Sequence, residues 1–259
     1  MSNLSELTQY RCMIKSLVRR DLRGRYKGSV LGFLWNFITP FMQMAVYILV
    51  FSTIFRAGIE DYAIFLIAGL TPWILFSDSM AEGSGVMVAN CELLKKIYFP
   101  RAVLPLALLL SKTVNFLIML VIVLIITVAV GHPLSIEALL FLPIALFLLM
   151  CFIMGLLLFL SSLNVFLRDI QYITTVVLLV LVWLTPIMYV WHSIDNALLE
   201  FILTYNPLTY FIELFHDIIY WGTIPSLEYL GITALLAAVS LAVGIFVFNK
   251  LQYRFAEVL

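Results

Sequence analysis

The stretch ELLKKIYFPRAVLPLALLL, residues 92–110, joins a short basic segment to the start of a long apolar one. Its first ten residues hold Lys95, Lys96 and Arg101 beside two aromatic side chains, whereas residues 102–130 carry a single charge, at Lys112. A helix of about 20 apolar residues can cross a bilayer, and short loops rich in Lys and Arg stay on the cytoplasmic side. The stretch therefore predicts a cytoplasmic loop that leads into a transmembrane helix.

The composition of the whole chain is that of a membrane protein. Of its 259 residues, 64% are hydrophobic and 12% are charged, whereas a typical soluble domain is about half apolar and about a quarter charged. The three cysteines (Cys12, Cys91 and Cys151) have no metal-ligand spacing, and two of them fall in segments predicted to be cytoplasmic. We therefore expect neither a disulfide framework nor a metal site.

Apolar segments of sufficient length predict an all-α membrane protein with six transmembrane helices. The predicted spans are residues 32–55, 63–82, 103–130, 138–163, 172–191 and 229–249. The segment 198–221 is also apolar, but Asn206-Pro207 and several charged residues interrupt it. There we predict two short helices that meet at Asn206-Pro207 in the outer interface, rather than a seventh span.

The placement of the cations sets the predicted orientation. Of the 15 Lys and Arg residues, all but Arg56 fall before the first span, between spans two and three, early in span three, between spans four and five, or after span six. The positive-inside rule then places both termini in the cytoplasm. We divide the chain into a cytoplasmic helix and linker, residues 1–31, and a transmembrane domain, residues 32–259. The basic, extended N-terminal region is not typical of a cleavable signal peptide.

Residues 4–23 predict an amphipathic helix that precedes the first span. Its apolar residues recur at three- and four-residue steps, and Arg11, Lys15 and Arg19 share another face. Such a helix lies in the membrane interface and is held by anionic headgroups. A contact with a cytoplasmic partner is the alternative role, and it does not exclude the first.

A second short helix is predicted in the cytoplasmic loop, beginning after Asn90, which is a favoured N-cap residue. Pro100 disfavours helical geometry at Phe99, so we expect the helix to end near Phe99 and span three to begin at Pro100. By local chemistry alone, an interfacial loop with aromatic residues among the headgroups is the favoured interpretation of this segment.

The chemistry of a membrane enzyme is not evident in the sequence. The three histidines (His132, His192 and His216) stand alone on the predicted outer side. Asp78 and Glu82 share a helical face, and we expect them to mark the cytoplasmic end of span two, a paired-carboxylate site being the alternative.

Lys112 is expected to extend back to the interface, the alternative being that it lines a passage. The sequence contains neither a phosphate-binding G-x-x-x-x-G-K-[ST] motif nor an ion relay within the spans. A transporter of this kind needs an energy source on a separate ATPase subunit.

Aromatic residues are frequent in the first two spans. Most are expected to pack or to face lipid, and a subset is a candidate for lining a conduit that offers flat apolar surfaces to sugar rings. The candidates for the conduit are Trp35, Phe37, Tyr47, Trp73 and Phe76.

Five blocks of the sequence resemble the permease subunits of ABC-2 type polysaccharide exporters, a family that includes O-antigen, teichoic acid and capsule exporters. The blocks are RYKGSVLGFLWNFITPFMQMAVYILVFSTIFR (25–56), GLTPWILFSDSM (69–80), NCELLKKIYFPRAVLPLALLLSKTVNFLI (90–118), LNVFLRDIQYI (163–173) and YNPLTYFIELFHDIIY (205–220). They cover nearly the whole chain in the same order.

The resemblance implies a subunit of the bacterial cytoplasmic membrane that pairs with a second copy of itself and with two ATP-binding cassette subunits. These partners would hold ATP and Mg²⁺, so this chain would have no cofactor and no catalytic residue, and no nucleic acid is implied. The cargo would be a glycan on a polyprenyl diphosphate carrier.

The resemblance also implies positions for coupling to the ATPase and for an outer gate. The coupling residues would be Glu92, Leu93, Lys95, Lys96, Tyr98, Phe99, Pro100 and Arg101, together with Arg25, Tyr26 and Lys27. The outer gate would be formed around Asn206, Pro207 and Tyr210. An ABC-2 exporter of a lipid or a drug, and a glycan-modifying membrane enzyme that uses Asp78 and Glu82, are the competing hypotheses.

Overall fold

The computed structural model describes residues 10–24, 34–54, 60–97, 99–191 and 196–258, and in these ranges the regular structure is helical throughout. The helices of the first half are α2 (Arg11–Gly24), α3 (Trp35–Ile54), α4 (Tyr62–Gly83), α5 (Val86–Ala89), α6 (Cys91–Lys96) and α7 (Val103–Val130). Those of the second half are α8 (Ile136–Leu139), α9 (Leu142–Phe166), α10 (Ile170–Leu181), α11 (Ala197–Tyr205), α12 (Pro207–His216), the π-helix η3 (Asp217–Trp221), α13 (Leu227–Leu251), the short 3₁₀ turn η4 (Gln252–Arg254) and α14 (Phe255–Val258).

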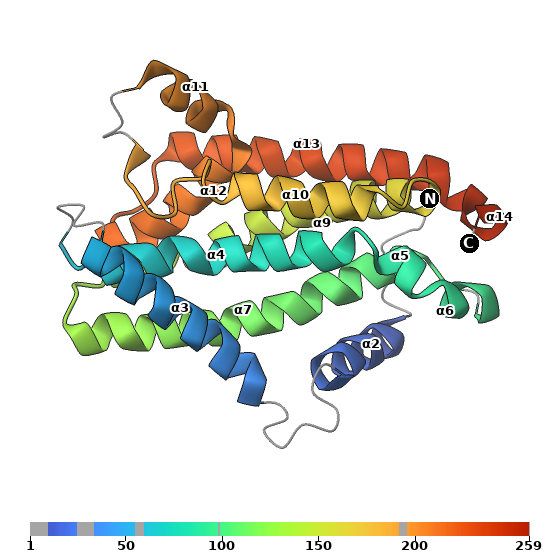
Figure 1. Ribbon diagram of the computed structural model, residues 1–259, viewed down its shortest axis with the longest axis horizontal. Helices are drawn as coiled ribbons and strands as arrows, with labels where there is room; N and C mark the ends of the chain where they lie inside the picture. Colours follow the sequence, from blue (N-terminus) through green and yellow to red (C-terminus); the bar gives the residue numbers. More distant parts are fainter. Residues whose placement is uncertain (1–9, 25–33, 55–59, 98, 192–195, 259) are drawn as a thin grey trace.

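The long helices run side by side along the longest axis of the molecule (Figure 1). Helices α4, α7, α9, α10 and α13 form this bundle, and α3 crosses it obliquely against α4 and α7. Helices α2, α5, α6 and α14 gather at one end. We call it the basic end, because it carries α2 with Arg11, Lys15 and Arg19 and the loop with Lys95 and Lys96. The hairpin α11–α12, predicted to lie on the outer side and therefore called the outer hairpin, lies at the opposite end.

Four helical stretches are long and apolar enough to cross a membrane, among the residues that the structure describes. They are Tyr62–Gly83, Val103–Val130, Ile136–Phe166 and Leu227–Arg254, and they correspond to predicted spans two, three, four and six. At the predicted first and fifth spans the apolar helical stretches are shorter, Phe41–Val50 and Ile170–Leu181. Six spans therefore stay a prediction.

The prediction of a fifth helix over 172–191 is wrong in its second half, because α10 ends at Leu181 and turns and bends follow. Pro186 has no N–H to donate and disfavours helical geometry at Thr185. The Thr185 hydroxyl donates to the Leu181 carbonyl at 2.7 Å, and the Asn206 side-chain amide donates to the Leu184 carbonyl at 2.8 Å. These side chains satisfy carbonyls that the ended helix leaves without helical partners.

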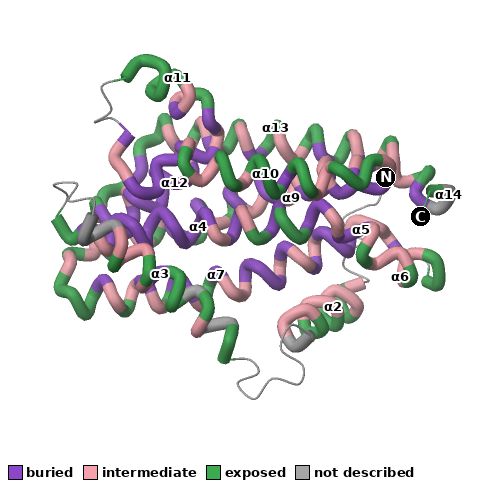
Figure 2. The backbone as a smooth tube through the Cα atoms, in the orientation of Figure 1, coloured by how far each residue is buried: buried purple, intermediate pink, exposed green. Residues whose placement is uncertain are grey.

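Helix α4 lies at the centre of the bundle and α13 at its edge (Figure 2). In the most apolar 18-residue stretch of each helix, the buried share is 78% for α4 and 17% for α13. The main core surrounds α4, where the side chains of Phe65, Leu66 and Ile67 are fully buried. The burial of so many side chains fixes α4 relative to its neighbours, which matters for the charged residues at its end.

Helices α9 and α13 cross at small residues, and this contact is the most extensive in the bundle. A Cβ built on Gly244 would overlap the carbonyl of Gly155, and a Cβ built on Gly155 would overlap the backbone of Ser240. The Ser240 hydroxyl also donates to the Phe152 carbonyl at 2.9 Å. Small residues of this kind let two membrane helices approach backbone to backbone. Our sequence analysis did not single out these residues.

Candidate functional site at the basic end

The predicted short helix of the loop is present as α6, with Asn90 at its N-cap. It ends at Lys96, because Ile97 is extended (φ −132°, ψ 133°), which is earlier than the predicted end near Phe99. Lys95 and Lys96 are exposed, and Lys96 forms an exposed ion pair with Glu92 at 2.8 Å. Helix α6 therefore presents its cations to the outside of the bundle. Of the other predicted coupling residues here, Leu93 is half-buried.

After α6 the chain turns back into the bundle through Phe99, which is buried. Pro100 does not begin the next helix. Its carbonyl accepts from the Val103 N–H at 3.0 Å, and α7 begins at Val103. Tyr98 lies outside the described residues. The loop is thus anchored by Phe99 directly behind the exposed helix α6.

The guanidinium of Arg101 lies 5.5 Å from the centre of the Phe255 ring, a cation–π contact. Phe255 begins α14 and is 1% exposed, with Phe248 and Phe166 around it at ring-centre distances of 5.8 and 6.1 Å. The C-terminal segment therefore packs against the predicted coupling loop. Our sequence analysis missed Phe255, although an aromatic residue in a polar tail was a visible signal.

These side chains belong to a second hydrophobic cluster, separate from the main core. Its buried members are Val86, Met87, Phe99, Val103, Leu104, Leu158, Val165, Phe248 and Phe255. Tyr10, Met13, Ile14 and Leu17 of the α2 region pack against it. The cluster thus joins the N-terminal helix, the loop and the C-terminal segment in one packed unit at the basic end.

Helix α2 divides its side chains as the sequence predicts, with Arg11, Lys15 and Arg19 exposed. Its apolar side packs on α7 and the second cluster, so the helix is held by protein contacts as well as by its charge. Residues 4–9 of the predicted helix, and the predicted contact residues Arg25, Tyr26 and Lys27, lie outside the described residues.

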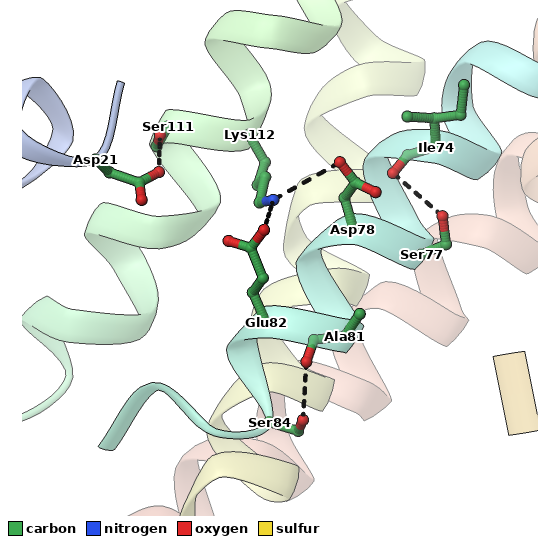
Figure 3. Close-up of polar contacts among 9 residues, drawn as sticks. All are labelled: Asp21, Ile74, Ser77, Asp78, Ala81, Glu82, Ser84, Ser111 and Lys112. Carbon is green, nitrogen blue, oxygen red and sulfur yellow. Dashed lines mark hydrogen bonds and ion pairs between the residues drawn. The ribbon is translucent and has the colours of Figure 1, made fainter. Parts of the chain in front are cut away.

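Two polar contacts join α2 to the transmembrane helices. The Arg20 guanidinium donates to the Asn90 side-chain oxygen at 2.8 Å, and the Asn90 amide donates to the Val86 carbonyl at 2.9 Å. The Ser111 hydroxyl of α7 donates to the Asp21 carboxylate (Figure 3). The two predicted cytoplasmic contact elements, α2 and α6, are therefore linked through Asn90.

The expectation that Lys112 extends to the interface is wrong, because its side chain is only 1% exposed. Its ammonium, carried by α7, lies 2.7 Å from Glu82 Oε1 and 3.6 Å from Asp78 Oδ2, and both of these carboxylates belong to α4 (Figure 3). A buried lysine stays charged only with such partners. Asp78 and Glu82 do share one face of α4, as predicted, and the partner cation comes from their own chain.

A hollow of about 470 Å³ opens beside this ion cluster. Residues of α2, α4, α5 and α7 line it together with Gln171 of α10, and its acidic side chains are Asp21 and Glu82. Small residues, among them Ala81 and Gly85, leave the space between these helices. The basic end therefore combines exposed cations on α2 and α6 with an acidic hollow between the helices.

The aromatic candidates for a conduit are in different environments. Trp73 and Phe76 are buried in the main core with ring centres 5.8 Å apart, Tyr47 packs against that core, and Trp35 is 36% exposed. The side chain of Phe37 lies outside the described residues. In the single chain, Trp73 and Phe76 thus act as packing residues, and their role in a conduit stays a prediction.

The outer hairpin turns at Asn206-Pro207, as predicted. The Asn206 amide donates to Leu184 O and to Thr185 Oγ1, and its side-chain oxygen accepts from the Leu208 N–H at 3.0 Å. Asn206 therefore fixes the hairpin to the end of α10. The Tyr210 hydroxyl donates to the Thr204 carbonyl at 3.0 Å, which joins α12 to α11.

Two of the three histidines do not stand alone, contrary to the sequence analysis. His132 lies 2.9 Å from Asp61 Oδ2 and 2.8 Å from the Tyr220 carbonyl, and it stacks on the Tyr220 ring. His216 is fully buried, stacks on Phe65 and lies 3.1 Å from the Phe65 carbonyl. Both stabilise the packing of the outer end, and His192 lies outside the described residues.

Burial raises the pKa of the Asp217 carboxyl to about 6, with a further increase from Glu213 and an opposing effect of His216. The folded protein therefore binds a proton here between about pH 4 and pH 6 that the unfolded chain releases, so this group reduces stability as the pH rises through that window.

We expect Asp217→Asn to be more stable than the wild type above pH 7 and to lose less stability between pH 4 and pH 7. Thermal unfolding in detergent over this pH range measures both effects. Glu200→Gln, which makes the same charge change at an exposed position, is the control. Equal pH dependence in Asp217→Asn and the wild type would contradict the effect of burial.

Comparison with known proteins identifies relatives over most of the chain. The sequence profile of the ABC-2 type transporter family matches residues 13–220. The O-antigen export system permease protein RfbA of Myxococcus xanthus is 34% identical over 253 residues, which are 97% of this chain and 97% of that protein. The RfbA protein of Klebsiella pneumoniae is 32% identical over 94% of this chain and 93% of its own length.

A more distant relative is the polysialic acid transport protein KpsM of Escherichia coli. It is 24% identical over 238 residues, which are 90% of each chain. The matches thus include the basic end, the ion cluster and the outer hairpin.

Proposed function

The chain belongs to the ABC-2 type transporter family, and from this premise we propose that it is the membrane permease of an ATP-driven exporter of O-antigen or a related polysaccharide. The similarity to O-antigen export permeases over 97% of both chains carries this proposal. Because the similarity extends over nearly the full length of both chains, the segments that form the basic end, the ion cluster and the outer hairpin are aligned with segments of that O-antigen export permease.

The working unit would contain two copies of this chain and two ATP-binding cassette subunits. The sequence has no G-x-x-x-x-G-K-[ST] motif, which supports a separate subunit for ATP and Mg²⁺. The cargo would be a glycan attached to polyprenyl diphosphate, exported across the bacterial cytoplasmic membrane. The clustering of cations at the basic end supports a cytoplasmic location of that end.

Two features of the basic end support a contact with an ATPase: exposed cations on α6 and a firmly packed chain behind them. Helix α6 exposes Lys95 and Lys96, and the chain behind it is anchored by the buried Phe99 and by Arg101 against Phe255. A displacement of α6 would therefore be passed to the second cluster, and through it to α2, α7 and α13. Discrete packed elements of this kind can carry coupling between distant sites.

The exit would lie at the opposite end, near the outer hairpin. Asn206 holds the turn of this hairpin by hydrogen bonds to Leu184 and Thr185, which follow α10, and by accepting from the Leu208 N–H of α12. Trp35, Phe37 and Tyr47 of α3 are the proposed aromatic lining of the conduit, since Trp35 is not buried by its own chain.

Reversing the charges of α6 tests the proposed coupling. We expect Lys95→Glu with Lys96→Glu to reduce export at least about 10-fold while ATP hydrolysis continues, because the reversed charges repel a surface that the cations attract. Export and ATPase activity of the reconstituted complex measure the two effects separately.

Lys250→Glu with Arg254→Glu, at exposed positions of α13 and η4, is the matched control for a general loss of positive charge at the basic end, because neither residue belongs to a predicted contact element. Full export by the α6 variant at normal protein levels would contradict a coupling role for Lys95 and Lys96.

A further inference from the structure

Helix α4 has one face, with polar residues at its end, that the other described residues do not cover. From Ile64 to Gly83 all its residues are buried except Ile74, Ser77, Asp78, Ala81 and Glu82. These five residues recur at three- and four-residue steps and so form one strip along the helix, which we call the α4 strip. Asp78 and Glu82 are 51% and 45% exposed, although they belong to the most buried of the long helices.

The carboxylates of the α4 strip are held in place by Lys112 of α7. Lys112 is the tenth residue of α7 and lies about 14 Å from its beginning, along a helix about 42 Å long. The hydrocarbon layer is about 30 Å thick. When α7 is centred in the bilayer, Lys112 lies roughly 8 Å inside this layer. The same count on α4, about 33 Å long, places Asp78 roughly 7 Å inside it and Glu82 at its edge.

Exposed carboxylates at this depth do not face lipid, because ionised groups inside a membrane face the bundle interior or a water-filled cavity and often mark a substrate path. The α4 strip also adjoins the hollow of about 470 Å³, since Ala81 and Glu82 line both. Asp21, Asn90 and Gln171 continue the polar lining toward the basic end. Polar groups, set among small and apolar residues, therefore extend from the basic end to the α4 strip.

The groups on this surface define what it can bind. The three carboxylates Asp21, Asp78 and Glu82 outnumber the two cations beside them, Lys112 and Arg20, which donates to Asn90 in the lining of the hollow. The net negative charge disfavours a diphosphate. Ionised carboxylates are strong acceptors of hydrogen bonds. Sugar hydroxyls are neutral donors that match them. The mixed polar surface thus suits the sugar units of a glycan and not its diphosphate carrier.

We propose that the α4 strip, with Lys112 and the adjoining hollow, is the cytoplasmic inlet for the sugar chain of the cargo. The inference rests on the proposed function in polysaccharide export and adds a site to it. Lys112 acts as a positioning residue, because it is buried and holds Asp78 and Glu82 toward the passage.

A cysteine at Ala81, between the two carboxylates, tests this inlet. The complex with its ATPase is reconstituted in liposomes from a chain with Cys12→Ser, Cys91→Ser and Cys151→Ala, and Ala81→Cys is labelled with a charged, water-soluble thiol reagent. Val176→Cys, on the exposed apolar face of α10, is the matched control for a position facing lipid.

We expect Ala81→Cys to react at least about 10-fold faster than Val176→Cys. A glycan trapped in the complex with a hydrolysis-deficient ATPase should slow the reaction of Ala81→Cys several-fold, and a bulky label at Ala81→Cys should block export. Slow reaction at both positions would mean that the strip faces lipid, and a disulfide between two Ala81→Cys chains would mean that it faces the second copy. Either result overturns the proposal, as does fast labelling that trapped glycan does not slow.

Export by the cysteine-free parent distinguishes a failure of the inlet proposal from a failure of the proposed function. A parent that exports glycan while Ala81→Cys shows no protection refutes the inlet alone. A wild-type complex that transports no glycan refutes the proposed function itself.

Discussion

Replacing both carboxylates of the ion cluster, by Asp78→Asn with Glu82→Gln, is expected to reduce the free energy of unfolding by about 3–5 kcal/mol. The variant leaves the Lys112 ammonium without an anionic partner at a position where its side chain is 1% exposed. An uncompensated buried charge has a far larger cost than the loss of an exposed ion pair. Thermal or denaturant unfolding in detergent measures the change.

The matched control adds Lys112→Met to the double variant. Methionine has a similar length and no charge, and replacing a complete buried ion pair by apolar or neutral groups is often close to neutral for stability. We expect the triple variant to recover most of the lost stability. Equal stability of the double and triple variants would contradict the burial of a charged Lys112.

This pair of variants also decides how a loss of function is interpreted. Loss of activity in Asp78→Asn with Glu82→Gln is what a membrane enzyme with two catalytic carboxylates predicts, but unfolding around Lys112 produces the same result. A stable triple variant removes that ambiguity. An inlet for sugar units predicts reduced export at normal stability, with ATP hydrolysis retained.

The second large effect is expected at the crossing of α9 and α13. Gly244→Ala places a Cβ onto the carbonyl of Gly155, so the two helices have to separate along their most extensive contact. Overpacking of this kind costs about 1–3 kcal/mol, although an alanine in a helix is by itself favourable by roughly 0.5–1 kcal/mol. Because the Cβ would overlap the backbone oxygen of Gly155, we expect the upper part of the overpacking cost and therefore a net loss of stability.

Gly231→Ala on the same helix is the control, because nothing lies within 4 Å of a Cβ built there. We expect this change to be neutral or to stabilise the protein by up to about 1 kcal/mol. The two substitutions are chemically the same and should have effects of opposite sign in thermal unfolding. A stabilising Gly244→Ala would contradict the close crossing.

Local sequence features predicted the helices well where one strong signal was enough. The span predicted over 103–130 matches α7, because a long apolar run ends at Gly131, which adopts the left-handed conformation (φ 82°). The break of the outer hairpin followed from Asn206-Pro207, where an N-cap residue precedes a proline that suits the first helical position.

The contacts between distant segments were not predictable in the same way. Lys112 is 30 residues from Glu82, and only the packing of α4 on α7 shows that it is paired rather than extended to the interface. The packing of Phe255 under Arg101 joins the C-terminal segment to a loop more than 150 residues earlier. The chain after α10 is held by Asn206, whose side-chain amide donates to the Leu184 carbonyl.

The most direct test of the proposed function is transport by the purified complex of this chain and its ATP-binding subunit in liposomes. We predict that a polyprenyl-diphosphate-linked polysaccharide crosses the membrane only when ATP is hydrolysed, and that an ATPase with its catalytic glutamate replaced stops the transfer. Transfer of the glycan by the complex with the inactive ATPase, or ATP-driven transport of a lipid or drug without any transport of glycan, would contradict the proposal.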